Sequence, residues 1–461
     1  MPLQLLSAGS NAQGQLGQNH LEDSYTFQSC LFGTSPSKLQ SQLPFDTVIS
    51  LSCGANHTCL LVGRKDSEGH TRELWGSGDG KKGQLGLSNT SLDAGQGTNQ
   101  TVFHRIDDTI LTASGIQPTD YRMEHVVASW ESTFIYLRPR TMDSRLSKGI
   151  LLSIGNNDYG DLGIGLSPSQ LGKTSHPQRV PLEDLLSKKY SFRLTGYDVR
   201  KLVAGLHHVV AIVDVFLDGP EASDSVVIGW GTYRQGQLGY LNFQTSGMKG
   251  KSKIPSYTTE PKVLQFPRDG WGDSKILDIA VGSSHTLLLL DSCKVVALGS
   301  NKKGQLDGVN EATGITGVHC SWNGCCLIRN PSPAHKNVDW SIYSSGRGEK
   351  GQLGRSDSAP SVTVSFPFAS TSHALIGFAC GSEHSLALFR KISNNIDPML
   401  SVEEVWGWGW NEHGNLGLGH TDDVHSPSLI WTNAGGSFKG SHVDSVWAGC
   451  GTSWIVLMQE S

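Results

Sequence analysis

A short glycine-rich motif, GQLG or a close variant, recurs seven times along the chain, each time after a strand-like apolar run. Its first glycine stands at Gly14, Gly83, Gly160, Gly236, Gly304, Gly351 and Gly414. A second unit, an apolar run, a turn of the GxxH type and another apolar run, also occurs seven times. Its copies are Val48–Val62, Val126–Leu137, Val199–Val213, Ile276–Leu290, Ile315–Ile328, Leu375–Phe389 and Val443–Leu457. Such self-similarity indicates one supersecondary unit repeated around or along a single architecture.

The repeated unit predicts four strands. Short β-branched or leucine-rich runs between glycine turns favour strands, and no segment keeps a helical period long enough to dominate. We therefore expect an all-β fold, a seven-bladed β-propeller that forms one domain over residues 1–461. In each blade we name the strand before GxxH A, the strand after it B, the strand before GQLG C and the return strand D.

The two chain ends are predicted to share a blade. The sequence begins with a C and a D strand and finishes with an A and a B strand. Combining them in one sheet closes the ring and leaves no open edge between the first and last blades.

Uneven spacing of the repeats predicts insertions near 87–122, 164–198 and 240–275, which are rich in Ser, Thr, Gly and Pro. Because the strands alternate in direction, the A-to-B and C-to-D turns share one face of the ring. We expect most of the inserted residues on the D strands and the D-to-A links, and therefore on the other face.

Charge and the start of the chain restrict the classes of partner. The 37 basic and 42 acidic residues give a net charge of -5, and no long basic run is present. A nucleic-acid face normally has the opposite balance, so we expect no direct nucleic-acid binding. The first residues carry no positively charged segment, and their apolar stretch is too small for a signal peptide or a membrane span. These features predict a soluble, intracellular protein without membrane contact.

The repeat also explains residues that resemble chemical sites. The GxxH histidines occupy the same place in each repeat and should be spread around the ring, each bonding a neighbouring turn from a partly buried position. These are His57, His208, His285 and His384. Two GxGxxG sequences, Gly78–Gly83 and Gly346–Gly351, continue into QLG rather than into a helix, so we interpret them as blade turns. With no catalytic constellation apart from the repeats, we predict that the chain is not an enzyme.

Nine cysteines are present, and no CxxC pair occurs. Cys53, Cys320 and Cys380 recur just before the turn of their repeats, where a small buried side chain fits. Cys325 and Cys326 lie on a strand pattern rather than on paired zinc knuckles. We therefore expect reduced core thiols, no metal site and no cofactor.

The turns that break the GxxH pattern are the candidates for function. One reads Ser-Trp-Glu-Ser with Trp130 and Glu131, and another reads Ser-Trp-Asn-Gly with Trp322 and Asn323. The last turn reads Gly449–Thr452 (GCGT). Tryptophan is enriched among binding hot spots, where its body is buried and its N–H finds a partner.

The last C strand adds three tryptophans. We interpret Trp406 and Trp408 as core residues, and Trp410 as part of an aromatic and acidic patch with the following turn residues Glu412 and His413. For the tryptophans of the irregular turns both interpretations, partner anchor and structural residue, stay open.

The tandem GxNxxGQLG and GxxH pattern resembles the regulator of chromosome condensation family, and it covers essentially the whole chain. The resemblance implies a seven-bladed propeller. The founding activity of that family, guanine-nucleotide exchange on a small GTPase, is the alternative function for this chain.

A closer resemblance is to the fungal alpha-tubulin suppressor, or killer toxin insensitivity, type within that family. It is carried by Gly381–His384 (GSEH), Trp406–Gly414 (WGWGWNEHG) and Gly449–Leu457 (GCGTSWIVL). It implies a non-enzymatic heterodimer with a small CSL-type zinc-finger protein of the diphthamide pathway, in which the partner holds the metal. The pair would support Elongator-dependent wobble-uridine modification of tRNA and diphthamide synthesis, in the cytoplasm and also in the nucleus.

We expect the face with the irregular turns to bind this partner. Trp130 and Trp322 would be the anchors, with polar and charged groups around them. The candidate partner-binding residues are Trp130, Glu131, Trp322, Asn323, Glu383, Trp410, Glu412 and His413.

Overall fold

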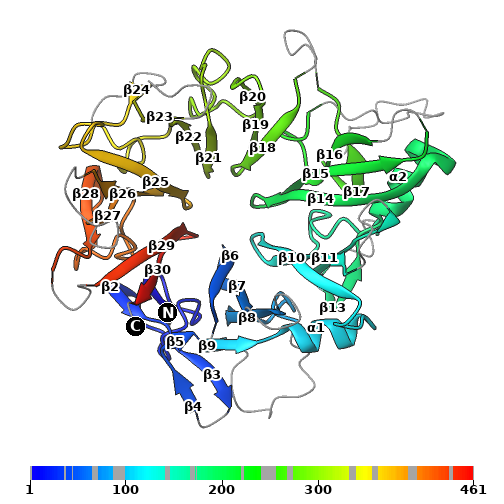
Figure 1. Ribbon diagram of the computed structural model, residues 1–461, viewed down its shortest axis with the longest axis horizontal. Coiled ribbons are helices and arrows are strands. Elements are labelled where there is room, and N and C mark those ends of the chain that lie inside the picture. Colours follow the sequence, from blue (N-terminus) through cyan, green and yellow to red (C-terminus); the bar gives the residue numbers. More distant parts are fainter. Residues whose placement is uncertain are drawn as a thin grey trace.

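Seven β-sheets stand around a central channel in the computed structural model of the chain (Figure 1). The structure describes residues 3–35, 38–43, 45–64, 71–86, 99–140, 146–166, 172, 174–219, 223–239, 256–266, 274–331, 339–355, 362–392, 402–435 and 440–459. Within each sheet the A strand borders the channel and the B, C and D strands follow outwards. The predicted seven-bladed β-propeller is confirmed.

We number the blades in chain order. Blade 1 holds β6 (Thr47–Cys53), β7 (His57–Arg64), β8 (Thr71–Asp79) and β9 (Asn99–Arg105). Blade 2 holds β10 (Tyr121–Ala128), β11 (Ser132–Pro139), β12 (Ile150–Gly155) and β13 (Thr174–Arg179). Blade 3 holds β14 (Leu194–Ala204), β15 (His208–Leu217), β16 (Ser223–Thr232) and β17 (Tyr257–Val263). Blade 4 holds β18 (Ile276–Val281), β19 (His285–Leu290) and β20 (Val295–Gly299).

The remaining blades complete the ring. Blade 5 holds β21 (Gly317–Ser321), β22 (Gly324–Arg329), β23 (Ser341–Gly346) and β24 (Val362–Thr363). Blade 6 holds β25 (His373–Cys380), β26 (His384–Lys391), β27 (Glu403–Gly409) and β28 (Val424–Thr432). Blade 7 holds β29 (Ser441–Ala448), β30 (Thr452–Gln459), β1 (Leu3–Gly9) and β2 (Ser24–Ser29).

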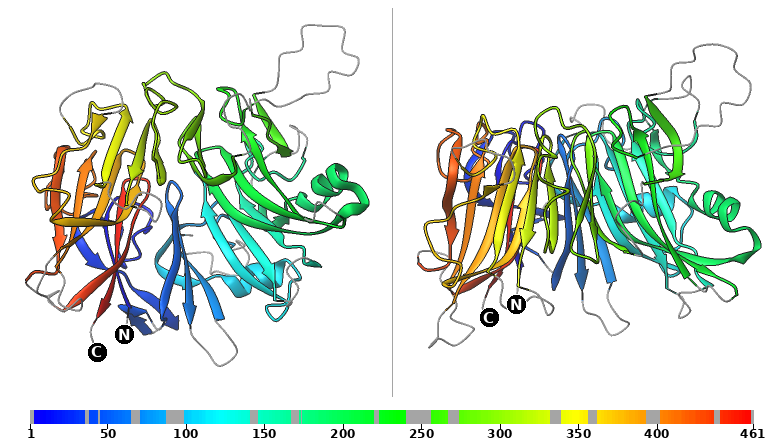
Figure 2. Two further views of the ribbon diagram at one scale, coloured as in Figure 1. Left: turned by 45° about the horizontal axis from the view of Figure 1, so that its top comes forward. Right: turned by 90° about the horizontal axis from the view of Figure 1, so that it is seen from above.

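Blade 7 is built from both ends of the chain, as predicted. The first strand, β1, pairs antiparallel with the last, β30, over seven residues, from Leu3 opposite Met458 to Gly9 opposite Thr452. The two termini lie side by side on one face of the ring (Figure 2). Strand β30 runs from its A-to-B turn towards Gln459, so both termini lie on the face opposite the A-to-B turns.

Three departures from the four-strand plan surround the ring. Blade 4 has three strands among the described residues. Blade 1 is extended by the hairpin β3 (Phe32–Ser35) and β4 (Lys38–Gln40), because β3 pairs parallel with β9. The two-residue strand β5 (Gln42–Leu43) pairs with β1.

Among the described residues, two short α-helices interrupt the all-β pattern. They are α1 (Asp107–Ala113) and α2 (Leu182–Tyr190), and a 3-10 turn, η3 (Ser191–Arg193), follows α2. Each helix packs apolar side chains against its blade, including Ile110 of α1 and Leu186 of α2. Acidic residues occupy the first turn of both helices, where they complement the helix dipole. Among the described residues, no helix is long and apolar enough to span a membrane.

The helices lie in D-to-A links, as we expected for the insertions. The stretches 87–98, 167–171, 240–255 and 267–273 of the predicted insertions lie outside the described residues. Three of them, 87–98, 167–171 and 240–255, connect β8 to β9, β12 to β13 and β16 to β17, each time a C to a D strand. Our placement of most inserted residues on D strands and D-to-A links is therefore wrong for these three.

The repeated glycines and leucines have the structural roles that the pattern predicts. Gly78 ends the C strand of blade 1 with φ +98°, and a Cβ there would overlap the carbonyl oxygen of Asn56. The leucine of the GQLG motif is buried in the apolar clusters between blades, as at Leu16, Leu85 and Leu416. The core is therefore a ring of blade-to-blade interfaces.

The GxxH histidines are more buried than predicted, and their side chains bond strands rather than turns. Their exposed fractions are 0–1 %. In three of them Nε2 contacts a hydroxyl on the B strand of the next blade: His57 to Thr133 at 3.0 Å, His208 to Thr286 at 3.4 Å, and His384 to Ser453 at 3.0 Å. Burial lowers the pKa of His57 and His384 to about 4 and that of His208 to about 3, so all three are neutral at pH 7.

We expect these neutral histidines to make the fold acid-sensitive. Below their ordinary pKa of about 6.5 the unfolded chain binds protons that the folded chain excludes, so stability falls as the pH drops from about 6.5 towards 4. At pH 5 the loss is on the order of 2 kcal/mol for each histidine. Thermal unfolding followed at pH 7.5, 6 and 5 should show a progressively lower Tm. His57→Gln should reduce this dependence, and a Tm that stays constant from pH 7.5 to 5 would contradict the burial of neutral histidines.

Candidate protein-binding face

The two irregular tryptophan turns meet over the channel. Trp130 lies in the A-to-B turn of blade 2, and Trp322 lies in that of blade 5, on the opposite side of the ring. Their ring centroids are 5.6 Å apart, with an interplanar angle of 57°. Both side chains are half-buried. The pair therefore spans the mouth of the channel and presents one aromatic surface at its centre.

Neighbouring turns hold the backbones of both tryptophans. The amide of Ala55 donates to the carbonyl of Trp130 at 2.8 Å, and that of Trp322 donates to the carbonyl of Ser382 at 2.8 Å. Ser283 donates to the carbonyl of Trp322 through its amide and its hydroxyl. In contrast, neither indole N–H donates a hydrogen bond to any residue that the structure describes. The turns are thus fixed, while two indole donors stay available at the surface.

A cavity of about 550 Å³ lies beneath the tryptophan pair. Residues of all seven A strands line it, and both tryptophans are part of its lining. The lining combines small residues such as Gly205 and Ala280 with thiols and hydroxyls such as Cys320 and Ser129. A partner segment that displaces the indoles would find a polar and apolar channel below them.

A second aromatic group, which we call the rim group, lies on the same face across blades 5 to 7. It consists of Arg347, Lys350, Glu383, Trp410, Glu412, His413 and Asp23. The Trp410 indole donates to Glu412 at 3.0 Å, and the Lys350 ammonium lies 5.2 Å from the Trp410 ring centroid and 3.4 Å from Glu412. These contacts, the Trp410 hydrogen bond first, lower the pKa of the Glu412 carboxyl.

The rest of the rim group is also paired. The backbone amide of Trp410 donates to the carbonyl of Glu383 at 2.9 Å, and the Glu383 carboxylate lies 3.5 Å from Arg347. His413 contacts Asp23 at 2.7 Å. The patch expected to be aromatic and acidic is therefore aromatic with alternating charges, because basic side chains from blade 5 lie beside its carboxylates.

The other two predicted residues lie next to the tryptophans. The Glu131 carboxylate accepts a hydrogen bond from the Asn156 side chain at 2.7 Å. Asn323 follows Trp322 in the blade 5 turn, and its carbonyl accepts from the amide of Arg347 at 3.0 Å. Asn323 thus connects the tryptophan pair to the rim group, whereas Glu131 stays with blade 2. The core assignment of the neighbouring tryptophans also holds, since Trp408 is fully buried and Trp406 packs against Phe366 and Phe368.

One aromatic contact on this face was not predicted. Tyr159, in the C-to-D turn of blade 2, packs against His207 of the blade 3 turn, with ring centroids 4.5 Å apart and an interplanar angle of 50°. The side chain of His207 also contacts Asp161 at 3.0 Å. Tyr159 is 46 % exposed. The signal in the sequence was the motif variant NDYGDLG, in which Tyr159 and Asp161 replace the usual residues.

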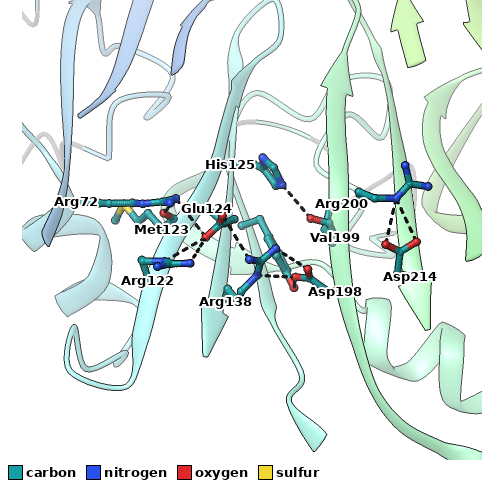
Figure 3. Close-up of polar contacts among 11 residues, drawn as sticks. Arg72, Arg122, Met123, Glu124, His125, Arg138, Asp198, Val199, Arg200 and Asp214 are labelled. Carbon is teal, nitrogen blue, oxygen red and sulfur yellow. Dashed lines mark hydrogen bonds and ion pairs between the residues drawn. The ribbon is translucent and has the colours of Figure 1, made fainter. Parts of the chain in front are cut away.

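The far end of the strands carries a network of ion pairs across blades 1 to 4 (Figure 3). Arg138 of blade 2 contacts Glu124 at 3.5 Å and donates to Asp198 of blade 3 at 2.9 Å. Arg72 of blade 1 contacts the same glutamate at 3.2 Å. Arg200 donates to Asp214 and to two backbone carbonyls of blade 4. Most of these charged side chains already pair with groups of a neighbouring blade. They are therefore less available to bind a partner than the residues of the tryptophan face.

Within the part of the chain that the structure describes, one group of side chains could hold a metal ion. His285, Cys320 and Cys325 each offer a ligand atom, and the three atoms lie within 4.8 Å of one another. The prediction that the repeated histidines do not converge is consistent with this, because only one histidine takes part. Our expectation of reduced core thiols and no metal site did not take into account this contact between blades 4 and 5.

Comparison with protein families identifies the repeat. The model of the regulator of chromosome condensation (RCC1) repeat matches residues 4–61, 341–388 and 403–456, which include the strands of the closing blade. The propeller contains RCC1 repeats. The sequence resemblance drawn from the GQLG and GxxH units is thereby confirmed at the level of the family.

Relatives of this RCC1-repeat propeller match over most of its length. It is 25% identical to the bovine (Bos taurus) secretion-regulating guanine nucleotide exchange factor. The alignment of 460 positions covers 92% of this chain and 78% of that protein. It is 24% identical to the ultraviolet-B receptor UVR8 of Arabidopsis thaliana, over 97% of this chain and 83% of the receptor. An RCC1 repeat-containing protein of Schizosaccharomyces pombe is 23% identical over 98% of both chains.

Solved structures agree with the fold of the RCC1-repeat propeller. Prp20p of Saccharomyces cerevisiae superposes with a TM-score of 0.63 at 17% identity, over 100% of this chain and 92% of that one. Human WBSCR16 superposes with a TM-score of 0.61 at 15% identity, over the whole of both chains. At this identity the likeness establishes the architecture.

Proposed function

We propose that the chain is a non-enzymatic, protein-binding propeller that forms a heterodimer with a small CSL-type zinc-finger protein. In this proposal the pair supports Elongator-dependent wobble-uridine modification of tRNA and diphthamide synthesis, in the cytoplasm and also in the nucleus. The observation that carries the binding role is the Trp130–Trp322 pair, with two unpaired indole donors over the channel mouth. Tryptophan is enriched among binding hot spots, where its apolar body is buried and its N–H finds a partner.

The choice of partner rests on three segments of the sequence that resemble the alpha-tubulin suppressor type. Gly381–His384, Trp406–Gly414 and Gly449–Leu457 come from blades 6 and 7. They contact one another: the amide of Ser382 donates to the carbonyl of Gly449 at 2.9 Å, and that of Trp410 donates to the carbonyl of Glu383 at 2.9 Å. The motifs therefore contribute to one continuous surface on the tryptophan face, as expected for a shared binding site.

The chemistry of this surface fits a small polar partner. The rim group contributes both signs of charge, and the tryptophan pair contributes a compact apolar centre. An interface with an aromatic centre and a charged border excludes water from the anchors while its border charges select the partner. The zinc ion of the partner would remain coordinated by the partner's own residues.

Affinity purification from the organism that encodes the chain tests this proposal. A tag after β30 lies on the face opposite the tryptophans and leaves the proposed interface free. We expect a CSL-type zinc-finger protein at about one copy per propeller, identified by mass spectrometry. Recovery of the propeller without such a protein, from cells that contain one, would contradict the proposal.

Guanine-nucleotide exchange on a small GTPase is the second candidate, since a relative carries that activity in its name. For this activity, one face of the ring would have to displace the contacts by which the GTPase holds magnesium and the phosphates of its nucleotide. Release of a fluorescent guanine nucleotide from candidate GTPases, measured with and without the propeller, separates the two functions. Acceleration of release would favour exchange, and an unchanged rate favours the binding role.

A further inference from the structure

Three blade interfaces share one buried polar contact. In each, the GxxH histidine of one blade meets a hydroxyl at the second position of the next blade's B strand. The pairs are His57 with Thr133, His208 with Thr286, and His384 with Ser453. The residue across the sheet from that hydroxyl is aliphatic: Ala128, Val281 and Ala448 respectively. The repeat thus follows one rule: a histidine of one blade faces a hydroxyl on the B strand of the next blade, and an aliphatic residue lies opposite that hydroxyl on the A strand.

The interface between blades 4 and 5 departs from this rule at two positions. Its histidine is His285, and the second residue of the next B strand, β22, is Cys325 instead of Thr or Ser. The residue opposite Cys325 on β21 is Cys320 instead of an aliphatic residue. Cys320 and Cys325 pack in the same apolar cluster as Leu287 and Leu289 of blade 4. Both sulfur atoms lie within 4.8 Å of a ring nitrogen of His285.

His285, Cys320 and Cys325, which we call the trio, have the burial and the polar environment expected of metal ligands. His285 is fully buried, and Cys325 is 2 % exposed. Neither ring nitrogen of His285 has a hydroxyl partner of the kind that Nε2 contacts in the three sister histidines, and the Cys325 thiol stands in its place. A buried imidazole that lacks a strong hydrogen bond loses about 1–3 kcal/mol, which a bound ion would recover. Cys320 lines the channel cavity, which gives an ion a path from solvent.

We propose that His285, Cys320 and Cys325 bind one thiophilic divalent cation of the Zn²⁺ class, with the fourth coordination position towards the channel. Two thiolates and an imidazole form a ligand set typical of Zn²⁺. Tetrahedral Zn²⁺ places sulfur and nitrogen ligand atoms roughly 3.5–3.8 Å apart. The ligand atoms of His285, Cys320 and Cys325 now lie at most 4.8 Å apart. Side-chain movements of about 1 Å would bring them into the tetrahedral range.

The position of the trio gives the ion a structural consequence. Cys320 and Cys325 flank the four-residue hairpin turn that carries Trp322 and Asn323. An ion held by both cysteines and by His285 would fasten this hairpin to blade 4. The binding of metal and the presentation of Trp322 are therefore expected to be linked.

Metal titration of the reduced full-length protein tests the site. After removal of metals with a chelator, Zn²⁺ is titrated in competition with a chromophoric chelator, and Co²⁺ is used as a spectroscopic probe. We expect one high-affinity Zn²⁺ per chain and a thiolate-to-cobalt charge-transfer band. Cys325→Thr and Cys320→Ala install residues that sister interfaces already carry, so both variants should fold with a Tm close to wild type. Each should weaken Zn²⁺ binding at least 100-fold and abolish the cobalt band.

Cys380→Ala is the matched control, because Cys380 occupies the equivalent A-strand position of blade 6 and also lines the channel. It should retain full binding. The absence of stoichiometric Zn²⁺ in the wild-type protein would overturn the proposal. So would equal Zn²⁺ affinity in either cysteine variant, or loss of binding in the control alone. If one variant fails to fold, the other decides the outcome.

Discussion

Removing residues 454–459 should abolish the folded ring. This change deletes nearly all of β30, which pairs with β1 on one side and with β29 on the other. Without it, the two chain ends lose their shared sheet, and blades 6 and 1 each expose an apolar face. An open sheet edge of this kind also promotes aggregation. We expect the truncated protein to be protease-sensitive and to elute as aggregate in size-exclusion chromatography.

A single substitution in the same strand gives a graded version of this test. Trp454 is fully buried, its ring lies 6.1 Å from that of Phe103 in blade 1, and its N–H donates to Thr452 at 3.2 Å. Replacing a buried tryptophan with alanine costs about 3–5 kcal/mol, a large share of the roughly 5–15 kcal/mol that stabilises a folded protein. For a chain of this size, the Tm should fall by about 3–5 °C.

Phe192→Ala is the matched control for Trp454→Ala. Phe192 is an aromatic side chain with 94 % exposure, in the 3-10 turn η3 that precedes β14 of blade 3. Its removal should change the free energy of unfolding by less than about 0.5 kcal/mol. Equal Tm values for wild type and Trp454→Ala, or a truncated protein that elutes and melts as wild type, would contradict closure of the ring by both termini.

Alanine at both Trp130 and Trp322 should weaken partner binding by about 30-fold or more. Truncating one hot-spot tryptophan commonly costs about 2 kcal/mol, which corresponds to a factor of about 30 in Kd. The ring itself should stay folded, because neighbouring turns hold these turns through backbone hydrogen bonds. The measurement is the Kd for the purified CSL-type zinc-finger protein, with the Tm of each variant recorded beside it.

A matched pair of variants locates the interface. Arg72→Ala and Arg200→Ala alter the ion-pair network at the far end of the strands and should leave the Kd unchanged (Figure 3). The tryptophan face would be rejected if the double tryptophan variant bound as wild type, or if the arginine variants weakened binding as strongly as the tryptophan variant.

The ring and its closure could be predicted from the sequence because each follows from the repeat. Seven copies of two units require seven blades, and a chain that starts with C and D strands must finish its ring with A and B strands. The core role of Trp408 followed from the same register. The two helices were missed, because α1 has seven residues and α2 has nine, too few for a clear helical period.

Contacts between blades were harder to predict than the blades themselves. That Trp130 reaches Trp322 depends on the width of the channel, which no local pattern encodes. The pairing of Glu412 with Lys350 depends on how adjacent C-to-D turns meet. The thiols beside His285 could have been recognised, since aligning the repeats places Cys325 where the sister interfaces carry a hydroxyl.

A calorimetric titration of the purified propeller with the purified CSL-type zinc-finger protein tests the proposed function most directly. The account predicts a complex of one propeller with one zinc-finger protein and a Kd of about 1 μM or tighter, as expected for an interface with an aromatic centre. An absence of binding at concentrations of about 100 μM, with both proteins folded and zinc present in the partner, would contradict it.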